Sequence, residues 1–185
     1  MSTRFPPIPR EQLDDAQRAV FDAIASGPRG GVVGPFNVLL RAPAAVSDAA
    51  QQLGAGLRFS GALDDRLREI AILTVSRRWS AQFEWFAHHP IAVKAGVDPA
   101  PLERLRQGGD PGFADATEQL VWRLSRAVLD RGRLDDAEFA AGRDALGEAQ
   151  LVELLAVLGY YTLLSFILNV GEVAVPEPKP FPEAT

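Results

Sequence analysis

The fold is decided by residues 63–97, which read LDDRLREIAILTVSRRWSAQFEWFAHHPIAVKAGV. A helix is predicted from Asp65 to Arg78, because an aspartate at its start can accept hydrogen bonds from the first free N–H groups. Its middle, residues 70–75, is apolar nearly all round, which is typical of a buried helix. A second helix is predicted over residues 81–95 with Ser80 as its N-cap. We therefore expect this helix pair to form the centre of the fold.

Helical patterns also dominate on both sides of this stretch, and no alternating strand pattern competes with them. Residues 26–41 are rich in glycine and proline and are predicted to form a loop. The sequence therefore predicts an all-α fold of seven to eight helices in a single domain over residues 1–185. The predicted helices are residues 11–25, 44–59, 65–78, 81–95, 99–106, 116–130, 136–146 and 148–170. The predicted parts are an N-terminal helix and Gly/Pro loop at 10–42, a core at 43–106, C-terminal helices at 114–170 and an extended tail at 171–185.

The composition excludes several classes of protein. The chain has 185 residues and no cysteine, which excludes disulfide scaffolds, thiolate metal sites and thiol nucleophiles. The net charge is −5 and the basic residues are scattered, so we expect no nucleic-acid partner. The first ten residues lack the apolar stretch of a signal peptide, and we expect a cytoplasmic protein.

The segment from Leu151 to Val170 is long and apolar enough to raise the question of a membrane span. It contains one ionised side chain, Glu153, but also several polar residues, and no cluster of lysine or arginine flanks it. We therefore expect a buried core helix or a helix at a subunit interface, and no membrane partner.

The chain has only two histidines, His88 and His89, and they are adjacent. Successive helical residues differ by about 100° around the axis, so the two rings face different ways. His88 falls on the stripe that contains Trp85, and Glu84 lies one turn before it. Such a carboxylate and imidazole can transfer protons. The alternative is an exposed pair of no functional consequence.

Glu69 is a further candidate, because a carboxylate at the start of the largely apolar stretch 70–75 is costly to bury unless it is paired. Its partner could be His88, which would give a Glu69–His88–Glu84 relay. It could also be Arg66 or Arg68 at the surface.

Residues 63–97 resemble the core of the carboxymuconolactone decarboxylase family, which includes the alkyl hydroperoxidase D proteins. The redox-active branch has Glu, eleven residues, Cys, two residues, Cys, three residues and His. At those spacings this chain has Glu69, Ala81, Glu84 and His88. Both cysteine positions are replaced, so the thiol peroxidase activity of that branch is excluded. The chain therefore resembles the cysteine-free members, in which an acidic residue stands at the second cysteine position.

The resemblance extends to the Gly/Pro loop before the core and to Gly159-Tyr160-Tyr161, and covers about two thirds of the chain. It implies an alkyl hydroperoxidase D-like helical bundle. It also implies a homo-oligomer, a trimer or hexamer, with a dimer as the alternative.

The function predicted from the residues and the resemblance is that of a lyase or isomerase-type acid–base enzyme without a cofactor. Its catalytic residues would be Glu69, Glu84 and His88, and its substrate a small carboxylated lactone, enol or cyclic ketone. Arg78 would bind a substrate carboxylate. Apolar pocket walls would come from Phe36, Trp85 and Tyr160.

Two other readings remain open for the same residues. One is a metal-dependent lyase or hydrolase with Glu69, Glu84 and His88 as ligands, although nothing in the sequence requires a metal. The other is a non-catalytic oligomeric binding protein. Arg78 could also serve only to stabilise the C-terminal end of its helix.

Overall fold

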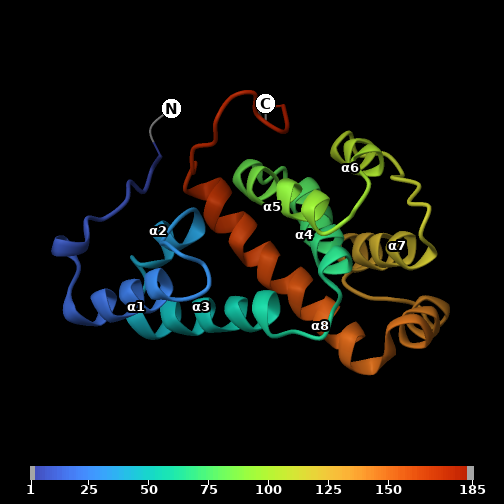
Figure 1. The fold of residues 1–185 in the computed structure, drawn as a ribbon, viewed down its shortest axis with the longest axis horizontal. Coiled ribbons are helices and arrows are strands. Elements are labelled where there is room, and N and C mark those ends of the chain that lie inside the picture. The colour runs from blue at the N-terminus through green and yellow to red at the C-terminus, as the bar shows by residue number, and fades with distance from the viewer. Residues whose placement is uncertain (1–2, 183–185) are drawn as a thin grey trace. The chain divides into compact units, whose positions relative to one another are not determined.

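The computed structural model describes residues 3–182, and within them the regular secondary structure is entirely helical (Figure 1). This confirms the predicted all-α class. The elements are η1 (Arg10–Gln12), α1 (Asp15–Ser26), α2 (Pro35–Leu39), α3 (Ala44–Phe59), α4 (Asp65–Trp79), α5 (Gln82–Lys94), α6 (Pro99–Arg106), α7 (Ala116–Arg131) and α8 (Asp136–Val170).

The described chain divides into two compact units. Residues 3–61 and 166–174 form the first, and residues 62–165 and 175–182 form the second. In the first unit, α1 and α2 pack against α3. The second unit contains α4 to α7 and most of α8. Residues 69, 84 and 88, the predicted catalytic set, all belong to the second unit.

Helix α1 begins later than the pattern indicates, because a capping box fixes its start. The Asp14 carboxylate accepts a hydrogen bond from the Gln17 backbone N–H at 2.8 Å, and the Gln17 side chain accepts one from the Asp14 N–H at 3.0 Å. The residues just before it, Arg10–Gln12, form a single 3₁₀ turn instead of the first turn of the predicted helix.

The predicted loop at residues 26–41 contains a short helix, α2, which the sequence pattern did not predict. Pro35 is its first residue, a position where the missing N–H costs nothing and the fixed φ suits a helix. Gly34 precedes it with φ 59° and ψ −124°, which a residue with a side chain rarely adopts. The proline therefore starts a helix instead of preventing one.

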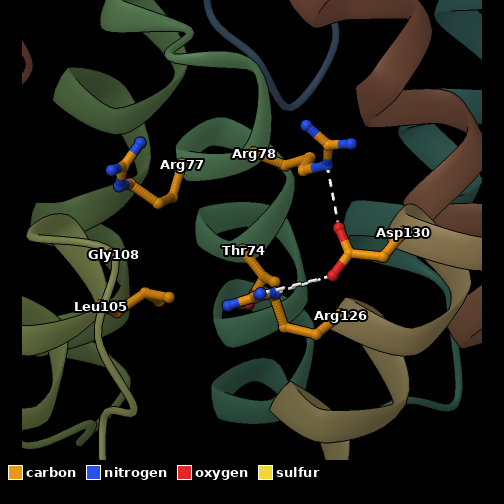
Figure 2. Close-up of a pocket in the computed structure, with 7 residues that line it drawn as sticks. All are labelled: Thr74, Arg77, Arg78, Leu105, Gly108, Arg126 and Asp130. Atoms are coloured by element: carbon orange, nitrogen blue, oxygen red, sulfur yellow. Dashed lines mark hydrogen bonds and ion pairs between the residues drawn. The ribbon is translucent and has the colours of Figure 1, made fainter.

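Helix α4 is the centre of the second unit, as predicted. Ten consecutive residues from Leu67 to Ser76 are buried, and α5 and α7 pack against the helix (Figure 1). Two charged side chains of α7 and one of α4 meet where these helices end, since Arg78 and Arg126 both contact Asp130 (Figure 2).

Ser80 does not cap α5, contrary to prediction. It lies in the left-handed region, with φ 49° and ψ 40°, and its backbone N–H donates to Arg77 and Ser76 carbonyls, so it ends α4. Ala81 is the residue before α5 and offers no side-chain cap. Only Ser80 and Ala81 therefore separate the two helices.

Helix α8 is interrupted at Gly147, where the sequence analysis placed the boundary between two helices. This glycine has φ 74° and ψ 167°. The helix is also the one segment among residues 3–182 that is long and apolar enough to cross a membrane, and half of its most apolar 18-residue window is buried inside the structure. A buried core helix of a soluble protein has the same properties.

The C-terminal tail packs onto the second unit through Phe181, which is only 3% exposed. Its backbone N–H donates to the Gln82 side chain at 2.9 Å, and its carbonyl accepts from that side chain at 2.8 Å. Arg106 donates to the Pro180 carbonyl at 2.6 Å. The predicted extended tail is therefore held in place as far as the structure describes it.

Candidate active site

Glu69 of α4 and His88 of α5 form a buried pair. The Nδ1 atom of His88 lies 2.7 Å from Oε2 of Glu69, and the two side chains come from helices that pack directly on each other. Glu69 is fully buried and His88 is 7% exposed. A carboxylate at this depth requires a partner, and α5 supplies it.

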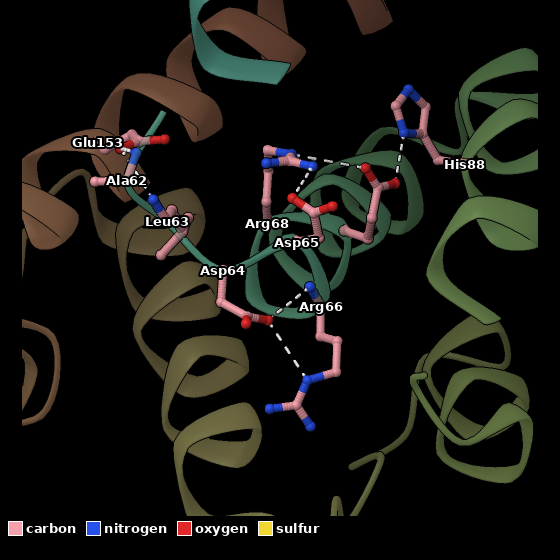
Figure 3. Close-up of polar contacts among 9 residues, drawn as sticks. Ala62, Leu63, Asp64, Asp65, Arg66, Arg68, His88 and Glu153 are labelled. Carbon is pink, nitrogen blue, oxygen red and sulfur yellow. Dashed lines mark hydrogen bonds and ion pairs between the residues drawn. The ribbon is translucent and has the colours of Figure 1, made fainter. Parts of the chain in front are cut away.

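Arg68 provides a cation on the other side of the same carboxylate. Its Nε lies 3.8 Å from Oε1 of Glu69, and its Nη2 donates to Asp65 at 2.7 Å (Figure 3). The sequence predicted either His88 or an arginine as the partner of Glu69. In the structure, Glu69 contacts both His88 and Arg68. Arg66 instead contacts Glu118 at 3.0 Å.

The contact with Glu69 determines which nitrogen of His88 is available for proton transfer. When Nδ1–H donates to the carboxylate, Nε2 of the neutral ring keeps its lone pair. The edge-to-face contact with Tyr161, at 5.1 Å between ring centroids, holds the ring plane. This geometry leaves a histidine whose orientation is fixed and whose second nitrogen can accept or donate a proton.

Glu84 is buried separately, with an exposed fraction of 2%. Ser165 of α8 hydrogen-bonds its Oε2 at 2.5 Å, while its Oε1 has no hydrogen-bond partner among residues 3–182. Burial raises the pKa of Glu84 to about 8, and the Ser165 hydrogen bond opposes this rise. With this pKa, Glu84 is mostly in its protonated, uncharged form at neutral pH.

The structure thus brings together two of the three predicted catalytic residues. Glu69 and His88 are in contact, whereas no hydrogen bond or ion pair joins Glu84 to His88 within the described chain. In the same range, no group of three or more histidine, aspartate or glutamate side chains is placed to hold one metal ion. The complete three-residue relay stays a prediction.

Two of the predicted pocket walls, Tyr160 and Trp85, make aromatic contacts in the second unit, and the contacts of Tyr160 lead to His88. The ring of Tyr160 meets that of Tyr161 edge to face at 5.4 Å, and Tyr161 in turn contacts His88. Trp85 stacks on His89 at 5.9 Å and meets Phe181 edge to face at 5.2 Å. Both predicted residues are buried, and their part in substrate binding stays a prediction.

The other two predicted binding residues lie elsewhere. Arg78 follows Glu69 by nine residues, a rise of about 13.5 Å along α4. It lines a pocket whose lining contains none of Glu69, Glu84 and His88. Phe36 belongs to the first unit, where it is buried under the guanidinium of Arg29 at 4.5 Å.

Three residues that contact predicted site residues were not themselves identified from the sequence: Arg68 beside Glu69, Ser165 on Glu84 and Phe181 on Trp85. Ser165 could have been found as a hydroxyl in an apolar helix one turn after Tyr161, on the same face. Nothing in the sequence indicated that Phe181 is buried, because a phenylalanine between prolines is typical of an exposed tail.

Comparison of the chain with models of known protein families finds no match, and comparison with curated proteins finds none either. The resemblance to the carboxymuconolactone decarboxylase family therefore stays a prediction, and the case for function depends on the geometry of the residues themselves.

Proposed function

We propose that this protein is a cofactor-free acid–base enzyme in which His88, oriented by Glu69, transfers a proton to or from a small carboxylated lactone, enol or cyclic ketone. The observation that carries the proposal is the buried 2.7 Å contact between His88 Nδ1 and Glu69. A buried carboxylate that fixes one imidazole nitrogen prepares the other for proton transfer.

In this proposal Nε2 of His88 is the atom that exchanges the proton. When it accepts one, the imidazolium carries a positive charge, and the Glu69 carboxylate stabilises that charge at 2.7 Å. Arg68 lies 3.8 Å from the other oxygen of Glu69 and places a second positive charge beside that carboxylate. His88 is the catalytic residue. Glu69 orients its ring and stabilises its positive charge, and Arg68 lies on the other side of the Glu69 carboxylate.

Glu84 would serve as a neutral proton donor. A carboxyl group whose pKa is about 8 holds its proton at neutral pH, as buried catalytic acids do. Its free Oε1 is the atom left to hydrogen-bond a ligand, since Ser165 occupies Oε2. Two groups of unlike basicity are thus available, an imidazole that can accept a proton and a carboxylic acid that can donate one.

Decarboxylation illustrates the chemistry that such a site supports. Breaking the bond to the carboxylate carbon releases carbon dioxide and leaves its electron pair on an enolate, which must then receive a proton at carbon. His88 as imidazolium, or Glu84 as acid, supplies that proton. Isomerisation requires the same two groups, one to remove a proton and one to return it.

The test is a screen of carboxylated lactones and β-keto acids with purified protein, followed by variants on each substrate found. We expect His88→Ala to lower kcat about 10²- to 10⁴-fold. His89→Ala is the matched control, because this neighbouring ring stacks on Trp85 and contacts neither Glu69 nor Glu84. Turnover at the wild-type rate by a folded His88→Ala protein would overturn the proposal.

Two alternatives are separated by further measurements. A metal-dependent reaction at Glu69, Glu84 and His88 requires stoichiometric metal in protein purified without an affinity tag, and loss of activity with a chelator. A non-catalytic binding protein would bind ligands from the screen without turning any of them over.

We further propose that the protein is a homo-oligomer that uses α8. Val152, Leu155 and Leu163 of this helix are 65%, 41% and 45% exposed in the single chain. Apolar side chains gathered on one helix face are typical of an interface. Light scattering coupled to size exclusion tests this, and a monomer at micromolar concentration would contradict it.

A further inference from the structure

A pocket of about 230 Å³ opens at the end of α4 (Figure 2), and neither Glu69 nor His88 lines it. Three of its seven lining residues are arginines from two different helices. The lining residues are Thr74, Arg77, Arg78, Leu105, Gly108, Arg126 and Asp130. With one carboxylate against three guanidinium groups, the formal charge of the lining is +2.

Asp130 is already shared between two of the arginines. Its Oδ1 lies 3.1 Å from Nε of Arg78, and its Oδ2 accepts hydrogen bonds from Nε and Nη2 of Arg126 at 3.3 Å each. Each guanidinium has five N–H donors in a planar fork. Most donors of Arg78 and Arg126 are thus not used by Asp130, and the carboxylate holds both side chains at the pocket.

Arg77 is the cation that Asp130 does not reach. No acidic side chain within residues 3–182 lies within ion-pair distance of it, and its buried Nε has no hydrogen-bond partner there. Figure 2 shows its guanidinium on the side of Gly108 and Leu105, apart from Asp130. A partly buried cation without a counter-ion is unfavourable, so a ligand that supplies the missing charge would be stabilised.

Two contacts hold Arg77 in this position without neutralising it. Its guanidinium carbon lies 5.6 Å from the centre of the Phe181 ring, a cation–π contact. Its Nη2 lies where a side chain on Gly108 would be, 2.7 Å from the position of a Cβ atom. The absence of a side chain at residue 108 therefore makes room for the guanidinium, and the tail covers it from another side.

We propose that this pocket binds a small divalent oxyanion, with Arg77 as its principal ligand and Arg78 and Arg126 as secondary ones. Two negative charges would neutralise the +2 lining. The planar forks of arginine match the oxygen pairs of phosphate and carboxylate groups. The volume suits a phosphate group or a small dicarboxylate, since pockets for larger ligands are typically 300–1,000 Å³.

The proposal does not depend on the acid–base function, because its residues are separate from Glu69, Glu84 and His88. The test is isothermal titration of the full chain with inorganic phosphate and, separately, with succinate, at constant ionic strength set by chloride. Saturable binding of either anion supports the site, and the anion that binds more tightly identifies phosphate or dicarboxylate as the ligand chemistry. Heats no different from added chloride for both anions would overturn it.

Three variants assign the binding to this pocket. Arg77→Gln should weaken the affinity about tenfold, because it removes charge-assisted hydrogen bonds. Asp130→Asn should tighten it severalfold, since the negative charge that repels the anion is lost while the amide oxygen of asparagine can still accept hydrogen bonds from the guanidinium groups. Arg143→Gln, which changes an exposed arginine outside the pocket, should leave it unchanged.

The first two variants are expected to change the anion affinity in opposite directions. This separates a binding effect from damage to the fold, because damage to the fold at either position can only weaken binding. Equal weakening by Arg77→Gln and Arg143→Gln would show non-specific attraction to surface charge and would overturn the proposal. Weaker anion binding by a folded Asp130→Asn protein would also overturn the proposal.

Discussion

The buried carboxyl group of Glu84 makes the stability of this protein depend on pH in a calculable way. In the unfolded chain its pKa is the ordinary 4.5, and in the fold burial raises the pKa to about 8. Below pH 4.5 both states are protonated. Between pH 4.5 and 8 the unfolded chain releases a proton that the folded chain keeps, so the free energy of unfolding falls as pH rises. Above pH 8 the effect levels off.

The magnitude follows from the difference between the two pKa values, which is 8 − 4.5, or about 3.5. Each pH unit in this range lowers the free energy of unfolding by about 1.4 kcal/mol, and the whole difference corresponds to about 5 kcal/mol. Within the accessible range from pH 5 to pH 9, the loss comes to about 4 kcal/mol. This is a large part of the stability of an ordinary domain.

The comparison that isolates this effect is wild type against Glu84→Gln, since glutamine does not titrate and can still hydrogen-bond Ser165. Urea unfolding at fixed protein concentration, followed by tryptophan fluorescence, gives both free energies at each pH. We expect the value for wild type minus that for Glu84→Gln to fall by about 4 kcal/mol from pH 5 to pH 9. All groups that titrate in both proteins cancel.

Glu103→Gln is the control for this series. Hydrogen bonds from Arg106 and Gln107 lower the pKa of Glu103 to about 2, so Glu103 is mostly ionised in both states over this range. The wild-type minus Glu103→Gln difference in unfolding free energy should therefore change with pH almost only through the interaction of Glu103 with His89. A wild-type minus Glu84→Gln difference that is equally flat would refute the reasoning, because Glu84 would then be ionised in the fold at neutral pH.

Three smaller predictions use the same unfolding assay. Ser165→Ala removes the hydrogen bond that lowers the pKa of Glu84, so the fall in stability should continue to higher pH than in wild type; an unchanged plateau would contradict this. Gly147→Ala should cost about 1–3 kcal/mol, because φ 74° with ψ 167° is accessible almost only to glycine, and a neutral result would show that the interruption of α8 is not needed. Asp14→Ala should cost about 1 kcal/mol through loss of the α1 capping box, and an unchanged free energy of unfolding would contradict this.

The helices could be predicted because their signals are local. The apolar run after Glu69 predicts a buried helix, and Gly147 interrupts the last long helix where the sequence places a boundary. The elements that were predicted wrongly also have local causes. A proline at residue 35 is compatible with the start of a helix as well as with a loop, and the sequence alone does not distinguish the two.

The site was harder to predict because its contacts join distant segments. Helical spacing places Glu84 beside His88, and the cost of burying Glu69 made His88 one of its candidate partners. The structure pairs His88 with Glu69, 19 residues earlier, but pairs Glu84 with Ser165, 81 residues later. Burial decides these pairings, since each buried polar group takes the partner that tertiary packing brings to it. Spacing along one helix carries no information about the neighbouring helix.

Nitrogen NMR of the two histidines tests the central claim most directly, that Glu69 holds Nδ1 of His88 and leaves Nε2 for proton transfer. With ¹⁵N-labelled protein, long-range ¹H–¹⁵N correlation spectra distinguish the protonated from the unprotonated nitrogen of each neutral ring, and His89 serves as the internal reference. The structure predicts neutral His88 with a proton on Nδ1 and none on Nε2, and a change in this preference in Glu69→Gln with His89 unaffected. Neutral His88 with its proton on Nε2 would contradict the proposed role of the pair.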